Sequence, residues 1–233
     1  QVLDLEALAN HRSSVLGLIP GQSQPTQKAF DTRVWTALQA FDTARPVYIE
    51  SESKKVGNVV VPGSLMAAMR SSPCLHLQLS EEERVKLLLE DYDFFVRDIE
   101  FFCARLDALT EARGKAVVAD WQARSRAGGV AGVVKDLLLI HYDPVYLQSM
   151  QRNFEHYGMA RPLAPRDHSV AAMQALVLNG NACFLCHMAN RGQRMGVVGG
   201  ELGEEVRAGR NQRLGAGKIG QVCRGLGGEN GVI

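Results

Sequence analysis

The sequence lacks any long run of apolar residues. Its longest aliphatic stretch covers only residues 137–140, whereas a membrane-spanning helix needs about 20 apolar residues and the core of an export signal needs roughly 7 to 15. We therefore expect a cytoplasmic protein with no membrane partner. The chain begins with Gln1, and an apolar, strand-like run follows at once. This start suggests that an upstream part is missing, so we expect a fragment of a longer protein.

Cysteine is scarce, and neither sign of charge dominates. The five cysteines are an odd number in a chain without an export signal, which predicts reduced thiols rather than a disulfide framework. Cys74 and Cys103 lie in apolar surroundings, where we expect buried and inert thiols. The net charge is only +1, so a nucleic acid would have to be bound by a local cluster of Lys and Arg.

Glycine is scarce in most of the chain but frequent near its end. Nine of the 23 glycines lie in residues 1–177, and fourteen lie from Gly180 onward. The glycine-rich part shows no sustained apolar period, so it can bury little surface to offset its ordering entropy. We therefore predict a domain over residues 1–177 and a Gly- and Arg-rich, disordered tail over residues 178–233.

Strand and helix patterns alternate over the first eighty residues. Short apolar runs or period-two spacing predict strands at residues 2–5, 46–49 and 74–79. Helical spacing of apolar residues predicts helices over residues 26–41 and 62–69. This alternation is typical of an α/β fold in which helices connect parallel strands.

The second half of the chain is predicted to be mostly helical. Ser80 and Glu83 form a capping-box pattern, which predicts the start of a long helix. Helical spacing predicts further helices over residues 94–109, 116–125, 130–141 and 146–157. The Asp143-Pro144 pair is expected to interrupt the helical path.

Polar side chains follow the first two predicted strands. They are Asp4, Glu6, His11 and Arg12 after the first strand, and Glu50, Glu52, Lys54 and Lys55 after the second. Ligands of open α/β sheets bind at the carboxyl ends of the strands, where Arg and Lys can pair with phosphate. A solvated loop or an ordinary surface helix explains the same residues equally well, so spacing alone leaves both interpretations open.

The predicted tail contains a motif that is typical of haem attachment. Cys183, Cys186 and His187 have the C-x-x-C-H spacing of c-type haem attachment, in which two thiols bind the porphyrin and the histidine becomes an axial ligand. Covalent haem attachment normally accompanies export, for which the sequence shows no signal. A c-type haem protein therefore remains an alternative, and a zinc site would need a distant ligand such as Cys223.

Four stretches, in order along residues 1–177, form a more specific signature. They are Val-Leu-Asp-Leu-Glu-Ala-Leu-Ala-Asn-His-Arg at 2–12, Gln-Pro-Thr-Gln-Lys-Ala-Phe at 24–30, Glu-Ser-Glu-Ser-Lys-Lys-Val-Gly at 50–57 and His-Tyr-Asp-Pro at 141–144. The signature resembles the C-terminal, P-loop-type part of the tRNA 2-selenouridine synthase family. Members of that family are similar in having an N-terminal rhodanese-like domain with a reactive cysteine and a Walker A loop before the first stretch. Both are missing from this sequence.

The resemblance implies a partial P-loop-type parallel sheet and a tRNA-modifying selenotransferase. The implied reaction replaces sulfur by selenium at wobble 2-thiouridine in tRNA, with selenophosphate as donor, through an S-geranylated intermediate made from geranyl diphosphate. With the rhodanese-like partner domain missing, we expect the fragment alone to be inactive. An alternative from another class is a non-catalytic module that docks tRNA or a partner domain.

The resemblance also implies roles for the strand-end residues. A diphosphate leaving group needs fixed cationic donors, so we expect Arg12, Lys28, Lys54 and Lys55 to converge on an anion pocket for the small organic diphosphate or tRNA. The supporting residues are expected to be Asp4, Glu6, His11, Glu50 and Glu52. Of these, Glu50 and Glu52 would hold a cation or orient the lysines. No resident metal and no covalent cofactor are predicted, and the catalytic residue is not identified.

Overall fold

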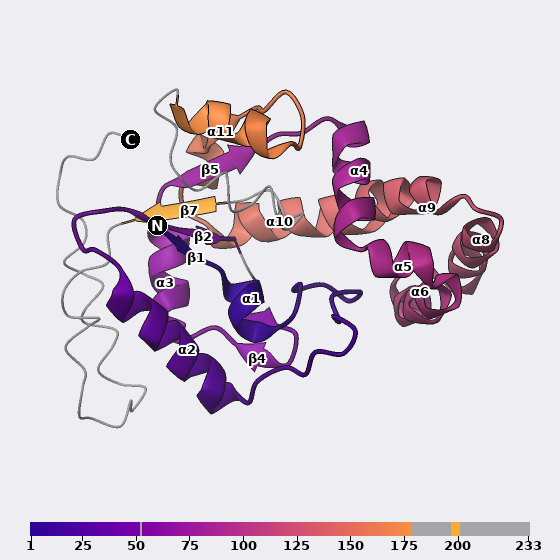
Figure 1. Ribbon diagram of the computed structural model, residues 1–233, viewed down its shortest axis with the longest axis horizontal. Helices are drawn as coiled ribbons and strands as arrows, with labels where there is room; N and C mark the ends of the chain where they lie inside the picture. Colours follow the sequence, from indigo (N-terminus) through magenta and orange to yellow (C-terminus); the bar gives the residue numbers. More distant parts are fainter. Residues whose placement is uncertain (52, 179–196, 201–233) are drawn as a thin grey trace.

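The chain folds as a mixed α/β structure with a sheet at one end and a helical layer at the other (Figure 1). The computed structural model describes residues 1–51, 53–178 and 197–200. The α/β class and the mostly helical second half predicted from the sequence are confirmed. No helix among these residues is long and apolar enough to cross a membrane.

Four of the five strands of the sheet point in one direction. Its five strands follow the order β1 (Val2–Leu3), β2 (Val47–Glu50), β7 (Val197–Gly200), β5 (Cys74–Leu77) and β6 (Arg161–Leu163). β1 is parallel to β2 and β5 is parallel to β6, whereas β7 is antiparallel to both β2 and β5. The strands β1, β2, β5 and β6 are therefore all parallel, and their carboxyl ends lie at one edge of the sheet.

β7 belongs to the predicted tail. Its backbone pairs with β2 on one side and with β5 on the other. The other residues of the tail after Leu178, with Cys183, Cys186, His187 and Cys223 among them, lie outside the described residues.

Helices cover both faces of the sheet. In β2, Val47 and Ile49 pack into one core, whereas Tyr48 packs on the opposite face against Met173, as the two-residue period of a strand requires. The first face is covered by α1 (Leu5–Ala9), α2 (Gln27–Ala40), α3 (Gly63–Ser71) and α10 (Asp143–Asn153), and the second by α11 (Val170–Leu178).

Local capping explains where the first elements begin and end. The Thr26 hydroxyl accepts the Ala29 amide (3.3 Å) and starts α2 at the predicted position. The first strand is shorter than predicted, because the Asp4 carboxylate accepts the Ala7 amide (2.6 Å) and starts α1 two residues after Leu3.

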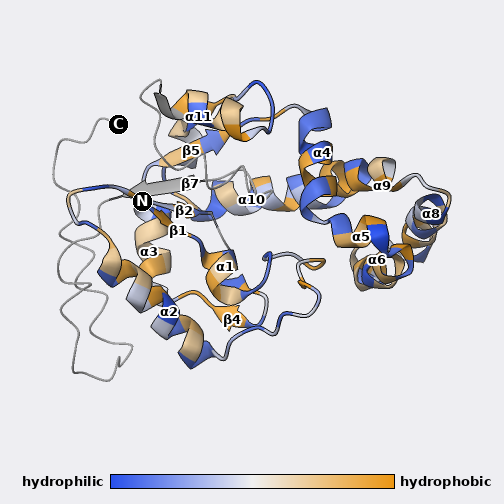
Figure 2. Cartoon of the chain, in the orientation of Figure 1, coloured by the Kyte–Doolittle hydropathy of each residue, from blue (hydrophilic) through white to orange (hydrophobic). Residues whose placement is uncertain are grey.

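The helical layer has a core of its own. It consists of α4 (Glu81–Asp91), α5 (Asp93–Arg97), α6 (Ile99–Leu106), α7 (Thr110–Arg113), α8 (Lys115–Arg126) and α9 (Val130–Asp136). Phe102, Leu106 and Trp121 are fully buried in this second core. Hydrophobic colour is accordingly prominent on α6, whereas α4 is largely hydrophilic (Figure 2).

The Asp143-Pro144 pair does not interrupt the helical path. The chain passes from α9 through a π-helical turn, Leu137–Tyr142, directly into α10. Pro144 lies in the first turn of α10, where a missing backbone N–H is tolerated. The expected interruption is therefore wrong.

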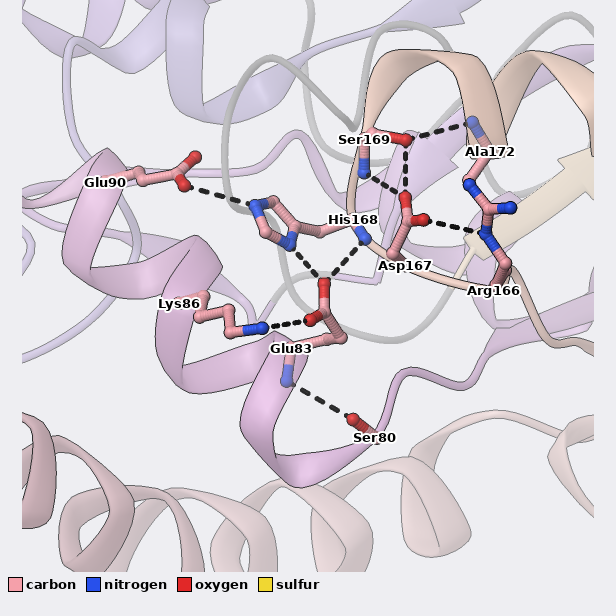
Figure 3. Close-up of polar contacts among 9 residues, drawn as sticks. All are labelled: Ser80, Glu83, Lys86, Glu90, Arg166, Asp167, His168, Ser169 and Ala172. Atoms are coloured by element: carbon pink, nitrogen blue, oxygen red, sulfur yellow. Dashed lines mark hydrogen bonds and ion pairs between the residues drawn. The ribbon is translucent and has the colours of Figure 1, made fainter.

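The loop before α11 is fastened to α4 by His168 (Figure 3). The Nδ1 atom of His168 lies 2.5 Å from Glu83 Oε2, and its Nε2 atom lies 3.2 Å from Glu90 Oε1. Burial opposes the charged ring, but the bonds to Glu83 and Glu90 outweigh it and raise the pKa of His168. Hydrogen bonds from Lys86 and His168 lower the pKa of Glu83 to about 2.

The start of α4 agrees with the capping-box pattern. The Glu83 amide donates to the Ser80 hydroxyl (3.3 Å), so the predicted helix start is confirmed.

We predict that the contact of His168 with α4 stabilises the fold most between the ordinary pKa values of 4.5 for Glu83 and 6.5 for His168. The raised pKa of His168 means that its contribution is complete below its unfolded pKa and is lost as the pH rises through the folded pKa. The lowered pKa of Glu83 means that its contribution is present above 4.5 and is lost as the pH falls towards about 2. His168→Gln should therefore lower Tm inside this window more than in alkaline solution.

Thermal melts over a pH series measure this effect, with His156→Gln as the control outside the contact. Lys86, Arg166 and Asp167 also lie at this junction, so the salt concentration must be held constant across the series. An equal Tm loss for His168→Gln at all pH values would contradict the prediction.

Candidate functional site

The carboxyl ends of β1 and β2 are joined by a buried carboxylate. The Glu6 amide donates to Glu50 Oε1 at 3.0 Å, and Glu50 is only 3% exposed. Its second oxygen, Oε2, has no hydrogen-bond partner among the described residues. Burial, reinforced by the negative charges of Asp4 and Glu6, raises the pKa of Glu50 well above its usual value. The protonated form of the Glu50 carboxyl is therefore more favoured at this site than it would be in water.

The acidic residues at these strand ends form no group of three potential metal ligands in the part of the chain that the structure describes. No group of three or more His, Cys, Asp or Glu side chains in that part could hold a metal ion. Asp4 caps α1 through its contact with the Ala7 amide, and Glu52 lies outside the described residues.

A hairpin that the sequence did not predict follows β2. It consists of β3 (Lys55–Val56) and β4 (Val59–Val60), and Gly57 lies between them with φ +60°, a conformation that glycine adopts without strain. Gln24 donates to the backbone oxygens of Ala9 (3.2 Å) and Val56 (3.0 Å) and accepts the Asn58 amide at 2.8 Å. The hairpin is thereby fixed to the end of α1.

Gln27 fastens the same hairpin to α2. Its amide group donates to the Val60 carbonyl and accepts the Val60 amide, each at 2.8 Å. The segment at the start of α2 thus holds β3 and β4 in place. Lys54 and Lys55 lie exposed on this fixed hairpin.

Arg12 connects the loop after α1 to the helical layer. Its guanidinium forms an ion pair with Asp91 at the end of α4 and lies over the Tyr92 ring, 5.0 Å from the centroid. The next residue, Ser13, donates from its hydroxyl to the Lys55 carbonyl at 3.4 Å. The loops after β1 and β2 therefore lie side by side, as their parallel strands predict.

A cavity of about 350 Å³ lies between the sheet and the helical layer. The strand-end loops supply its polar wall, which includes Glu6, Arg12, Ser13, Ser14, Ser51 and Ser53. The helical layer supplies most of its apolar wall, which includes Leu87, Leu88, Phe95, Val134, Leu137 and Leu138. Its volume lies within the range of sites for small organic ligands. The cavity therefore combines hydroxyl groups at one side with aliphatic and aromatic surface at the other.

The two arginines on the cavity wall are each paired with a carboxylate. Besides the pair of Arg12 with Asp91, Arg84 makes a two-pronged contact with Asp143, with Nη1–Oδ2 at 2.9 Å and Nη2–Oδ1 at 2.5 Å. Bidentate pairs of this kind hold a guanidinium in a defined orientation. On the sheet side of the cavity, the Ser51 hydroxyl lies 2.5 Å from the Tyr146 hydroxyl of α10.

The structure places the predicted phosphate-binding residues in two groups. Arg12 lines the cavity, whereas Lys28, Lys54 and Lys55 are exposed and are not among its lining residues. The backbone at Lys55 nevertheless lies beside the Arg12 loop. The supporting residues Asp4, Glu6, His11 and Glu50 are buried at this edge of the sheet. Whether these residues bind an anion stays a prediction.

Sequence reasoning assigned no role to four cavity residues from α4, the π-helical turn and α10. Arg84, His141, Asp143 and Tyr146 all line the cavity. His141 and Asp143 belong to the fourth stretch of the signature, which was the only indication that this segment matters. Cys74 and Cys103 are buried free thiols, as predicted, and burial raises the pKa of both.

We predict that Glu50→Gln stabilises the chain at neutral and alkaline pH. A raised pKa means that the protonated carboxyl is favoured in the fold, so stability is lost as the pH rises from the unfolded value of 4.5 through the folded value. Glutamine keeps the oxygen that accepts the Glu6 amide and carries no charge to bury. The free energy of unfolding, from urea melts, should exceed that of the unmodified chain at high pH, and the difference should shrink below pH 4.5.

Glu100→Gln is the matched control for this substitution. Arg126 bonds both carboxylate oxygens of Glu100 at 2.8 Å and lowers its pKa, so this change should weaken stability slightly at neutral pH. A loss of stability at high pH in Glu50→Gln as well would show that the buried carboxylate is ionised and stabilising.

Comparison with known proteins identifies relatives of part of the chain. Residues 1–100 match the family model of the tRNA 2-selenouridine synthase AAA domain. The tRNA 2-selenouridine synthase of Alcanivorax borkumensis is 35% identical over 131 residues, which are 55% of this chain and 36% of that protein. The enzyme of the same name from Marinobacter nauticus is 38% identical over 94 residues, 39% of this chain and 25% of that protein.

A longer and more distant match extends into the second half of the chain. The tRNA 2-selenouridine synthase of Hahella chejuensis is 28% identical over 182 residues, which are 66% of this chain and 48% of that protein. The chain thus spans between a quarter and a half of the length of these three relatives. No solved structure matches the chain. The resemblance found in the sequence is confirmed, and residues 1–100 of the chain are similar to the AAA domain of the tRNA 2-selenouridine synthases.

Proposed function

We propose that the chain is part of an enzyme that replaces sulfur by selenium at wobble 2-thiouridine in tRNA. Selenophosphate is the selenium donor in this proposal, and geranyl diphosphate forms an S-geranylated intermediate. The relatives named tRNA 2-selenouridine synthase support the reaction class. The parallel strands with their site at the carboxyl edge support a P-loop-type sheet as its scaffold.

The two-sided chemistry of the cavity is the observation that supports geranyl diphosphate as a ligand. A geranyl chain is apolar, and burying it against Phe95 of α5 and the leucines of α4 and the π-helical turn removes hydrocarbon from water. The diphosphate head would lie at the serine-lined wall, where hydroxyl groups can donate hydrogen bonds to its oxygens.

The cationic residues proposed to bind the diphosphate and tRNA lie in two places, on the cavity wall and on the exposed surface. Arg12 is held on the cavity wall by Asp91 and Tyr92, so it acts at a fixed place. Lys28, Lys54 and Lys55 are exposed and would attract phosphate from solvent, where the interaction is screened by salt. Asp4, Glu6, His11 and Glu50 support the strand ends from inside, and no step of the proposal requires a metal ion.

We predict that affinity grows steeply with the length of the apolar chain. Geranyl diphosphate has five carbon atoms more than dimethylallyl diphosphate, and each buried CH₂ contributes about 0.8 kcal/mol. Because the additional carbon atoms are not completely buried, we expect geranyl diphosphate to bind on the order of 100-fold more tightly than dimethylallyl diphosphate. Isothermal titration of the full chain with geranyl diphosphate, dimethylallyl diphosphate and pyrophosphate measures this series. Equal affinity of the three ligands would exclude the cavity as the site of the apolar chain.

A product assay tests whether the bound geranyl group is transferred to tRNA. The full chain is incubated with geranyl diphosphate and a tRNA that carries wobble 2-thiouridine, and the nucleosides are analysed by mass spectrometry. A geranylated nucleoside would support the transferase proposal. Ligand binding without any product would instead identify a docking module whose catalysis belongs to another part of the protein.

We also predict that the exposed lysines act on the phosphate group alone. Changing Lys54 and Lys55 together to Ala should weaken binding of pyrophosphate and of geranyl diphosphate by the same factor, about tenfold at low salt, because the charge and not the apolar wall is altered. Lys115→Ala, on the exposed surface of α8, is the matched control. Unchanged binding in the double variant would remove both lysines from the site.

A further inference from the structure

One face of α4 forms part of the cavity wall. Four of its residues line the cavity: Arg84, Leu87, Leu88 and Asp91. The last three follow the first by three, four and seven positions, a spacing that places all four on the same side of a helix. Arg84 and Asp91 are about 10 Å apart along the helix axis, because each residue adds about 1.5 Å. The ion pair of Asp91 with Arg12 therefore lies at one end of this face, and Arg84 lies at the other.

The guanidinium of Arg84 is held by the carboxylate of Asp143. Nη1 lies 2.9 Å from Oδ2, and Nη2 lies 2.5 Å from Oδ1. Arg84 belongs to the first turn of α4 and Asp143 to the first turn of α10, so both side chains leave regular helical backbone. They are 17% and 25% exposed, and both line the cavity. The pair is therefore largely withdrawn from water but can be reached by a ligand in the cavity.

The pair presents hydrogen-bond donors and acceptors side by side. A guanidinium carries five N–H donors, and the two contacts with Asp143 use two of them. A carboxylate has about four lone-pair positions, and Arg84 occupies one on each oxygen. Because the charges of the pair cancel, a group that only accepts hydrogen bonds is attracted by Arg84 and repelled by Asp143. A group with both anionic oxygens and an O–H proton can bond to both side chains.

We infer that Arg84 and Asp143 form a binding site for a phosphate-type oxyanion that still carries a proton. Further N–H groups of Arg84 donate to the anionic oxygens of the ligand, and an oxygen of Asp143 accepts the ligand O–H. Phosphate keeps a proton at neutral pH whereas sulfate does not, so Asp143 determines the specificity of the site. The inference rests on the proposed function for the natural ligand, which is then the phosphoryl group of selenophosphate. No covalent bond is formed or broken in this role.

We predict that the full chain binds inorganic phosphate about tenfold more tightly than sulfate. Both anions are tetrahedral and similar in size, so the proton that Asp143 accepts is the main difference between them. A hydrogen bond to a charged group accounts for a preference of this order. Isothermal titration at neutral pH and constant ionic strength measures both affinities. Equal affinities for the two anions would overturn the inference.

Substitutions separate the roles of the two side chains. Arg84→Gln removes the cation, so it should weaken phosphate binding about tenfold or more. Arg84→Lys keeps the charge without the two-pronged geometry and should lose less. Asp143→Asn removes the negative charge that repels sulfate, so the preference for phosphate should disappear, which the loss of a merely structural contact would not cause. Unchanged phosphate binding in Arg84→Gln, or an unchanged preference in Asp143→Asn, would contradict the assigned roles.

The pair of Arg126 with Glu100 provides a matched control. It is also a two-pronged contact, with both distances at 2.8 Å, but neither residue is among those that line the cavity. Arg126→Gln should therefore leave the binding of phosphate and of sulfate unchanged. Circular dichroism melts show whether each variant is folded. The ratio of the two affinities in the unmodified chain tests the inference even where a variant does not fold.

Titration with geranyl diphosphate separates this inference from the proposed function. If phosphate binds with dependence on Arg84 and Asp143 and geranyl diphosphate does not bind, the oxyanion site stands and the proposed substrate fails. If geranyl diphosphate binds and phosphate shows no preference over sulfate, the oxyanion site is wrong and the proposed substrate stands.

Discussion

The hydrogen bond from the Glu6 amide to the buried Glu50 carboxylate determines how the site is built. It ties the turn after β1 to the end of β2, so the loops that leave these two strands must start side by side. One loop carries Arg12 and the other leads to the hairpin of Lys54 and Lys55. Burying this carboxylate near Asp4 and Glu6 is unfavourable, and the raised pKa of Glu50 is the sign of that conflict. Such a conflict is typical of functional sites, where stability is given up for a defined arrangement.

The cavity exists because the α/β part and the helical layer have separate cores. Phe154 and Met150 on its wall belong to the core under the sheet, whereas Phe95 and Leu137 belong to the helical core. Directional polar contacts bridge the two parts beside it, chiefly the ion pairs of Arg12 with Asp91 and of Arg84 with Asp143. Ion pairs and hydrogen bonds need specific geometry, so they can hold two layers apart where apolar packing would close the space.

Sequence reasoning located the elements with strong local patterns and missed those without them. The helix at α2 was predicted within one or two residues, because Phe30, Val34 and Leu38 have helical spacing and Thr26 provides a cap. The strands β3, β4 and β6 are two or three residues long and show too little periodicity to be recognised. The contacts of the candidate site were even harder to predict than the short strands. Asp91 is 79 positions from its partner Arg12, and Tyr146 is 95 positions from Ser51, so only the folded chain reveals these contacts.

The paired charges change what the basic residues can contribute. Because Asp91 and Asp143 balance Arg12 and Arg84, the cavity wall offers oriented guanidinium groups but little net positive potential. Attraction of an anion over a distance must then come from exposed cations such as Lys54 and Lys55 at the neighbouring hairpin. Recognition at close range depends on groups that are already oriented, and the serine hydroxyls of the strand-end loops are such groups. The folded chain sets their positions, because Ser51 contacts the Tyr146 hydroxyl and Gln24 and Gln27 hold the hairpin that follows Ser53. The exposed lysines can attract an anion from solvent, but other side chains orient it at the cavity. The position of the lysines in the sequence therefore could not by itself locate the cavity.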